Sequence, residues 1–217
     1  MCSYSDISIL NISQKIFALD GSNLGNILIW GTLTSKKGFL NETPKRRQTY
    51  WSQFANVKGN VFNIENIAGK KALISFYRFA QCPFCNLRIH ELTKRYDELE
   101  NKLEIIAIFD SPLDHLIKST KKHKAPFEIL ADENFKYFDA YGVEKSLFKF
   151  FIGSVVNVHR LIKASLLGFV PLQFKGSMLT VPVDILIDET CNIEQVYYGR
   201  NTTDHMSLDE IFDFAKK

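Results

Sequence analysis

A Cys-x-x-Cys pair, Cys82-Pro83-Phe84-Cys85, stands between a strand-like and a helix-like segment and constrains the fold more than any other feature of the chain. The preceding residues 71–78 have the composition of a buried strand, and residues 86–92 carry Leu and Ile at helical spacing. A Cys pair at such a junction is typical of thiol–disulfide chemistry. The positive end of a helix favours a thiolate over a thiol, and Pro83 suits the first helical position. The spacing therefore predicts a redox site at the start of a helix over 83–100.

Strands and helices alternate along most of the chain after residue 57. This alternation implies a parallel or mixed sheet covered by helices on both faces, which is an α/β fold. Ser207, with Glu210 three residues later, predicts the start of a last helix. The expected strands are 61–64, 72–78, 103–109 and 127–131, the other expected helices are 110–124 and 133–141, and residues 181–188 and 193–198 form an expected hairpin at the sheet edge.

Composition narrows the class of protein. Lys and Arg number 27 against 24 Asp and Glu, so charge does not indicate a nucleic-acid partner. Residues 1–6 begin polar and acidic, unlike a signal peptide, and no apolar run approaches the ~18 residues of a transmembrane helix. The four cysteines, at 2, 82, 85 and 191, do not form the framework of a secreted disulfide-rich domain. We therefore expect a reducing, cytoplasmic compartment, with free thiols at Cys2 and Cys191.

Ordered sequence runs across roughly three quarters of the chain carry a family resemblance. These runs are Ser75-Phe76-Tyr77-Arg78, Cys82-Pro83-Phe84-Cys85-Asn86-Leu87-Arg88, His90-Glu91-Leu92, Tyr141-Gly142-Val143-Glu144-Lys145-Ser146, Val183-Asp184-Ile185-Leu186-Ile187-Asp188, Tyr197-Tyr198-Gly199-Arg200 and Asp204-His205. On these residues, the stretch from about 57 to 214 resembles the peroxiredoxin-like (AhpC/TSA-related) family.

The resemblance implies a thioredoxin-like fold with a mixed central sheet flanked by helices. It also implies a thiol-dependent oxidoreductase that needs no cofactor, acts on a peroxide or disulfide, and is reduced by a thioredoxin or glutathione system. Pro182 resembles the cis-proline that faces the Cys-x-x-Cys pair in thioredoxin-fold proteins. A Pro that begins a strand is also tolerated in the trans form, and cis X-Pro bonds are uncommon.

The chain departs from the usual peroxiredoxin pattern, Pro-x-x-x-Thr-x-x-Cys. Aligned on Cys85, the Pro and Thr positions hold Arg78 and Cys82; aligned on Cys82, they hold Ser75 and Phe79. The residues instead favour two-cysteine chemistry. Cys82, expected at an exposed helix tip with a pKa below the ~8.5 of a free cysteine, would attack, and Cys85 would resolve the mixed disulfide. A peroxiredoxin register would reverse these two roles.

Other residues around the pair have open interpretations. Arg78, four residues before Cys82, could add positive charge beside the thiolate or simply end a strand. His90 is expected to be a surface or half-buried residue rather than a proton shuttle. Zinc binding is an alternative function of the Cys pair. It needs a second pair of ligands, for which only the scattered residues Cys191, His159 and His205 are available. His205 and Asp204 have no assigned role.

Two further segments fall outside the common pattern. Residues 1–56 form an expected extension of unknown role, ahead of a domain over 57–217, and contain a short expected strand at 25–31 and a basic connector at 43–48. Residues 145–178 form an expected helical insertion before the Pro182 strand, with apolar residues at helical spacing and interspersed Lys and Arg.

The 145–178 segment has three possible roles: packing on its own domain or on a second subunit, a lid over the Cys pair, or an interfacial membrane helix. We expect protein rather than lipid to cover it, which leaves a homodimer possible. Two classes of function also stay open for the whole chain. One is an oxidoreductase with turnover, and the other is a thioredoxin-fold sensing or binding module that switches once per signal.

Overall fold

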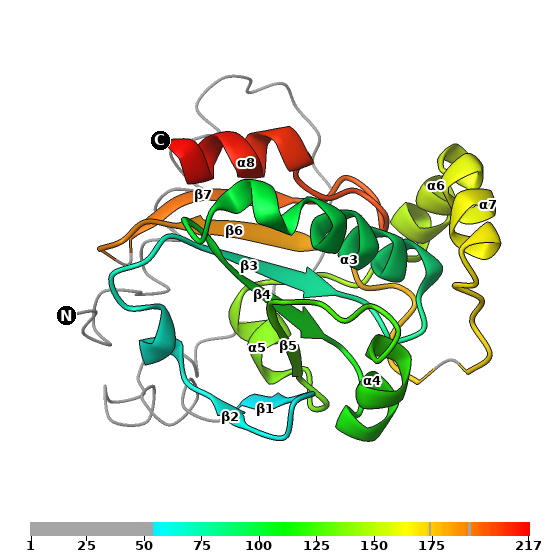
Figure 1. Cartoon of the computed structure of the whole chain (residues 1–217). Coiled ribbons are helices and arrows are strands. Elements are labelled where there is room, and N and C mark those ends of the chain that lie inside the picture. Colours follow the sequence, from blue (N-terminus) through cyan, green and yellow to red (C-terminus); the bar gives the residue numbers. More distant parts are fainter. Residues whose placement is uncertain (1–53, 174, 191) are drawn as a thin grey trace, which may run out of the picture.

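The computed structural model describes residues 54–173, 175–190 and 192–217. Its core is a seven-stranded mixed sheet with the order β2-β1-β5-β4-β3-β6-β7 (Figure 1). The strands are β1 (Phe54–Asn56), β2 (Val61–Phe62), β3 (Ala72–Tyr77), β4 (Glu104–Phe109), β5 (Glu128–Ala131), β6 (Val183–Ile187) and β7 (Ile193–Tyr198).

The central strand β3 leads directly into the Cys-x-x-Cys pair. It runs parallel to β4 and antiparallel to β6, so that Ser75 faces Ala107 on one side and Asp184 on the other. All six residues of β3 are buried, as expected for a strand covered on both faces. The carboxyl ends of β3 and β4 therefore share one edge of the sheet, where the Cys pair begins.

Helices cover the sheet in two layers (Figure 1). On one face, α3 (Pro83–Arg95), α4 (Leu113–Thr120) and α8 (Leu208–Lys216) share an apolar cluster with β3, β4 and β5. On the other face, α5 (Lys136–Ala140) and the 3-10 helix η1 (Ile64–Ile67) pack on the alternate side chains of the same strands. The α/β, thioredoxin-like architecture expected from the sequence is confirmed.

Most expected elements are present with shorter bounds. The helix expected over 83–100 ends as α3 at Arg95 and continues as the 3-10 helix η2 (Tyr96–Leu99). Ser207 caps α8 as expected, because its Oγ accepts the Glu210 N–H at 3.1 Å. The strand expected at 25–31 and the basic connector at 43–48 lie outside the described residues. The domain boundary at 56/57 stays a prediction, although β1 already pairs with β2 and β5.

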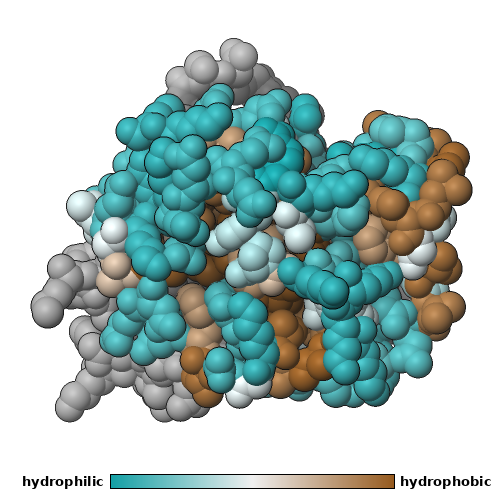
Figure 2. Space-filling view, viewed as in Figure 1, coloured by the Kyte–Doolittle hydropathy of each residue, from teal (hydrophilic) through white to brown (hydrophobic). Residues whose placement is uncertain are grey.

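Residues 145–178 contain the helices α6 (Leu147–Val156) and α7 (Val158–Leu166), which project at one end of the sheet (Figure 1). The inner side of this hairpin meets α3, where Ala164 clusters with Leu87. Its outer side carries exposed apolar residues, and Figure 2 shows hydrophobic atoms gathered there. We call this area the hairpin surface; it comprises Leu147, Phe148, Phe151, Ile152, Val155, Val156, Val158, Ile162 and Leu166.

The hairpin packs on its own domain through its inner side, while its outer side is uncovered in the single chain, where Phe148 is 74% exposed. The expected packing on the domain or on a second subunit stays a prediction for that outer side. The apolar spacing within residues 145–178 predicted the helices, but it did not predict what covers their outer side. Among the described residues, no helix is long and apolar enough to cross a membrane.

Candidate active site

The Cys pair forms the first turn of α3. Cys82 is the N-cap residue, and its Sγ accepts the Cys85 N–H at 3.4 Å. Pro83 follows in the first turn, where its missing N–H costs no hydrogen bond. The Cys82 carbonyl accepts the Asn86 N–H at 2.9 Å, which begins the helical ladder. The two thiols are free and lie three residues apart on this one turn, a placement suited to forming a reversible disulfide.

The pKa values of the two thiols are shifted in opposite directions. Burial raises the pKa of Cys82, but the hydrogen bond from the Cys85 thiol, the Arg78 charge and the backbone N–H groups of Cys85 and Phe84 outweigh it and lower that pKa to about 6. Burial and the neighbouring Cys82 raise the pKa of Cys85 well above its ordinary value. Near neutral pH, Cys82 is therefore the thiolate and Cys85 the thiol. This asymmetry agrees with the lowered pKa expected for Cys82.

Arg78 is buried beside the pair. Its guanidinium lies over the Phe84 ring, 5.6 Å from the centroid, and Nη1 donates to the Met178 carbonyl at 3.2 Å. Nε and Nη2 have no hydrogen-bond partner among the described residues. Although burial opposes its charge, the two nearby sulfurs raise the pKa of Arg78 overall. Of the two sequence interpretations, a cation that acts on the Cys82 thiolate fits this geometry.

Cys82 is not exposed, contrary to the expectation from its place at a helix tip; its exposed fraction is 0%. Cys82 belongs to the main apolar cluster of the domain, and a segment far along the chain lies over the residues that precede it. We call residues 168–173 and 175–178, which follow α7, the strap. The N–H groups of Leu172 and Gln173 both donate to Gln81 Oε1 at 2.8 Å, and Met178 meets Arg78. The strap thus lies across residues 78–81, which lead into Cys82.

The strap is also anchored on the residues that directly follow β4. Ser177 N–H donates to Asp110 Oδ2 at 3.0 Å, and Ser111 Oγ donates to the Lys175 carbonyl at 3.4 Å. Gly176 has a φ of +114°, and a Cβ there would collide with the Asp110 carbonyl and lie 2.9 Å from Phe79 Cβ. Only glycine lets the strap approach this closely.

Asn86 and His123 were missed by sequence reasoning. Asn86 Nδ2 donates to the carbonyls of Ala80 and Cys82 at 2.8 Å each, which pins the Cys turn to α3. Its Oδ1 then accepts from His123 Nε2 at 2.7 Å. Burial is the main cause that lowers the pKa of His123 to about 4, so the ring is neutral and donates through Nε2. Asn86 follows the Cys pair and could have been noticed, whereas His123 has no sequence signal.

Phe169 of the strap completes this side of the site. Its ring stacks on His123 at 5.1 Å, meets His90 edge-on at 5.9 Å and lies 4.3 Å from Lys122 Nζ. Phe169 is only 5% exposed. His90 is half-buried, as expected, and its role here is packing against Phe169.

Pro182 differs from the expectation. No peptide bond among the described residues is cis, so the cis assignment is wrong. In the trans form the chain enters β6 extended, with Val181 N–H bonded to the Glu144 carbonyl and Gly199 N–H bonded to the Pro182 carbonyl, both at 2.9 Å. A proline at the first position before a strand needs no cis bond for this.

His205 and Asp204, unassigned from sequence, belong to two networks. His205 Nδ1 lies 3.1 Å from both oxygens of the buried Asp184, which also binds Ser75 Oγ and the Met206 N–H. Burial raises the pKa of Asp184, but the charges of His205 and Arg88 and these hydrogen bonds lower it overall. Asp204 pairs with Arg200 at 3.0 Å.

Within the described ranges, no group of three or more His, Cys, Asp and Glu side chains is arranged to hold a metal ion. Cys2 and Cys191 lie outside the described residues.

Comparison with known proteins places this geometry in a family. The model of the AhpC/TSA family matches residues 47–197, which is more than half of the chain. No curated protein matches this chain.

Three solved structures share the fold. The bacterioferritin comigratory protein of Xanthomonas campestris has 12% identity and a TM-score of 0.55 over 75% of this chain and 88% of its own. The peroxidoxin BcpB of Mycobacterium tuberculosis has 15% identity and a TM-score of 0.51 over 75% and 87%. The thiol peroxidase of Chromobacterium violaceum has 16% identity and a TM-score of 0.52 over 75% and 80%.

Proposed function

Because this chain belongs to the AhpC/TSA family of peroxiredoxin-like oxidoreductases, we propose that it reduces peroxides or disulfides with Cys82 as the attacking thiolate and Cys85 as the resolving thiol. The observation that carries the proposal is the opposite acidity of the two thiols, with Cys82 at the positive end of α3 beside buried Arg78. A thiolate is the reactive form of cysteine, and the protonated neighbour does not react until the second step.

With a peroxide, the Cys82 thiolate attacks the terminal oxygen. An S–O bond forms, the O–O bond breaks, and the leaving alkoxide takes a proton to become an alcohol. The Cys85 thiol then attacks the sulfenic sulfur, so that an S–S bond forms and water leaves with the Cys85 proton. An external dithiol supplies two electrons and two protons to restore both thiols. The solved structure from Xanthomonas campestris is described by its alkyl peroxide reduction activity, which supports including organic hydroperoxides.

With a disulfide substrate the same residues act in the same order. Cys82 attacks one sulfur to give a mixed disulfide and a leaving thiolate, and Cys85 then displaces the second half of the substrate. The missing Pro-x-x-x-Thr-x-x-Cys pattern favours this substrate class, because no threonine hydroxyl precedes either cysteine at the position that orients a peroxide.

Stopped-flow oxidation of the reduced protein tests the proposal, with hydrogen peroxide, an organic hydroperoxide and a model disulfide in separate arms. Cys85→Ser should accumulate a sulfenic acid or a mixed disulfide on Cys82, detected by mass spectrometry. Cys82→Ser should be inert in all three arms, and oxidised wild type should contain an 82–85 disulfide. If Cys82→Ser keeps fast peroxide consumption and Cys85→Ser loses it, the two roles are reversed.

The covered state of Cys82 favours a second candidate, a redox-sensing module in which oxidation changes the strap rather than supporting turnover. Cycling with a thioredoxin system separates the two, since an enzyme consumes many equivalents of oxidant and a sensor consumes one. For either role we propose a reducing, cytoplasmic location, supported by the paucity of cysteines outside the pair. A second copy on the hairpin surface is the partner we propose beyond substrate and reductant.

A further inference from the structure

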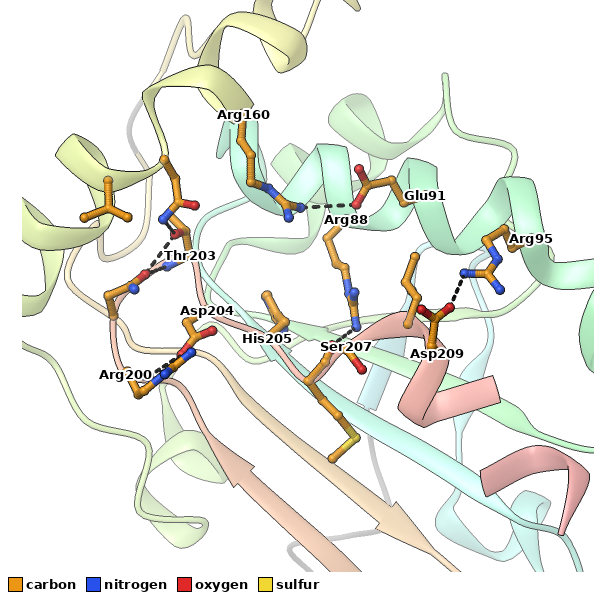
Figure 3. Close-up of a pocket in the computed structure, with 15 residues that line it drawn as sticks. Arg88, Glu91, Arg95, Arg160, Arg200, Thr203, Asp204, His205, Ser207 and Asp209 are labelled. Atoms are coloured by element: carbon orange, nitrogen blue, oxygen red, sulfur yellow. Dashed lines mark hydrogen bonds and ion pairs between the residues drawn. The ribbon is translucent and has the colours of Figure 1, made fainter. Parts of the chain in front are cut away.

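A polar pocket of about 540 Å³ lies beside the redox helix, between α3, the α6–α7 hairpin and the loop before α8. Figure 3 shows that charged side chains from all three elements point into it. Four arginines line it: Arg88, Arg95, Arg160 and Arg200. The proposed thiol chemistry uses none of them, and neither cysteine lines the pocket.

Three of these arginines are paired with carboxylates. Arg95 lies 2.9 Å from Glu98 and 3.1 Å from Asp209, and Arg200 lies 3.0 Å from Asp204. Arg160 Nη2 lies 3.2 Å from Glu91. These pairs lie at the wall and rim and neutralise much of the pocket's charge.

Arg88 is different. It is only 6% exposed, and within the described ranges it makes no ion pair at contact distance. Its Nη2 donates to the Met206 carbonyl at 2.6 Å. Its charge acts on Asp184, but that carboxylate is already bound by His205, Ser75 and the Met206 N–H. The cation of Arg88 therefore has no carboxylate of its own.

Two donors in the pocket lining lack an acceptor. Arg88 Nε and Arg160 Nε are both buried with no hydrogen-bond partner among the described residues. A buried donor without an acceptor destabilises the protein, and more so when it is charged. In Figure 3, Arg88 reaches from α3 toward the loop before α8 while Arg160 comes from the hairpin, so the two donors belong to different elements that line one pocket.

We propose that this pocket binds a small organic anion through a carboxylate or phosphate group that accepts from Arg88 and Arg160. Guanidinium groups match the planar geometry of such oxyanions. The volume lies within the range of small-molecule sites and exceeds what a single inorganic ion fills, which points to an organic molecule. The pocket is also lined by residues from the sequence runs that carry the family resemblance, namely Arg88, Arg200 and Asp204-His205. The proposal is independent of the redox assignment.

The binding test uses calorimetric titration of the full chain with matched probes. Succinate is compared with neutral succinamide, and glycerol 3-phosphate with glycerol, all at constant ionic strength set by NaCl. Binding of at least one anion, with no heat from the neutral partners, is expected. The two anionic arms distinguish a carboxylate from a phosphate ligand. Heats that are equal for the anions and their neutral partners would overturn the proposal.

Nitrogen-15 spectra of the arginine Nε–Hε groups give a second, direct measurement. The resonances of Arg88 and Arg160 should shift with the bound fraction, whereas those of the paired Arg95 and Arg200 should shift less. Assignment follows from loss of one peak in Arg160→Gln. Uniform shifts of all four peaks would indicate general ion screening and contradict a built site.

Variants locate the site. Arg88→Met should weaken binding of the better probe about tenfold or more, and Arg160→Gln several-fold, because each loses a charged hydrogen bond. Lys70→Gln removes the same charge outside the pocket and should leave the affinity unchanged. Should Arg88→Met fail to fold, the Arg160→Gln affinity and the wild-type Nε shifts still decide the question. Unchanged affinity in Arg160→Gln, together with an unshifted Arg88 resonance, would refute it.

Discussion

The strap and the α6–α7 hairpin come from one stretch of sequence, yet the fold uses them in opposite ways. Residues 145–178 contain five Lys and Arg, no Asp or Glu and many apolar residues in both parts. The strap buries Phe169 and lies across the entry to the Cys pair, whereas the hairpin leaves Phe148 74% exposed. Burial alone does not separate the two parts, because Leu172 of the strap is 81% exposed as well. The strap differs in that Gln81, Arg78 and Asp110 hold its backbone by hydrogen bonds.

The two phenylalanines offer the sharpest contrast in stability. Phe169→Ala should lower the free energy of unfolding by about 3 kcal/mol, because it removes a ring packed on His123 and His90. Phe148→Ala is the matched control and should change it by less than about 0.5 kcal/mol in the monomer. Chemical denaturation at low protein concentration measures both. Equal losses of unfolding free energy in the two variants would contradict this difference between Phe169 in the strap and Phe148 in the hairpin.

Displacing the strap should expose the attacking thiol. In Gly176→Ala the new methyl group meets the Asp110 carbonyl and Phe79, so the strap must move away from residues 78–81. We expect the rate of Cys82 alkylation by iodoacetamide to rise about tenfold, since it tracks the open population. Gly168→Ala is the control: this residue also has a positive φ, but nothing lies within 4 Å of its Cβ position. If both variants react like wild type, the strap does not limit access.

The hairpin surface should be an interface between two copies of the chain. Glu91 pairs with Arg160 and Lys163, and Glu144 pairs with Lys149, so much of the local charge is neutralised and the apolar face dominates. Light scattering should give a dimer for wild type and a monomer for the double variant Phe148→Ser/Phe151→Ser, with the Cys82 alkylation rate unchanged.

Vesicle flotation is the opposing measurement for the same surface. Wild-type protein should not float with anionic vesicles. Robust flotation that disappears in the double variant would assign the hairpin surface to lipid instead of a second copy.

The smallest expected effect concerns Arg78, which both tethers the strap and acts on the thiolate. Because only the thiolate reacts, the alkylation rate of Cys82 should rise with pH around a midpoint near 6 and level off above it. Loss of the cation in Arg78→Met should move this midpoint up by roughly one unit, since a nearby positive charge favours the thiolate. Arg78→Lys keeps the charge and should stay near the wild-type midpoint. A midpoint near 8.5 in wild type would contradict the assigned thiolate.

Much of the fold followed from local sequence patterns. Apolar runs predicted the strands β3, β4 and β5, and the Cys pair with Pro83 predicted where α3 begins. Ser207 predicted the cap of α8. These features depend on residues within a few positions of one another, since side-chain periodicity and helix capping act over one or two turns. The lowered pKa of Cys82 was accessible for the same reason, because the helix end and Arg78 lie within four residues.

Features that depend on contacts between distant segments could be seen only in the tertiary structure. The strap that lies across residues 78–81, just before Cys82, comes from about 90 residues further along the chain and is held through backbone groups that leave no sequence signal. The trans bond before Pro182 follows from how β6 joins its neighbours, and the Asn86–His123 contact follows from how α4 ends against α3. Sequence determined where the Cys pair stands and where α3 begins. Only long-range packing determined that the strap is tethered across residues 78–81 and that the outer side of the hairpin faces solvent, because the partners of both lie far away in the sequence.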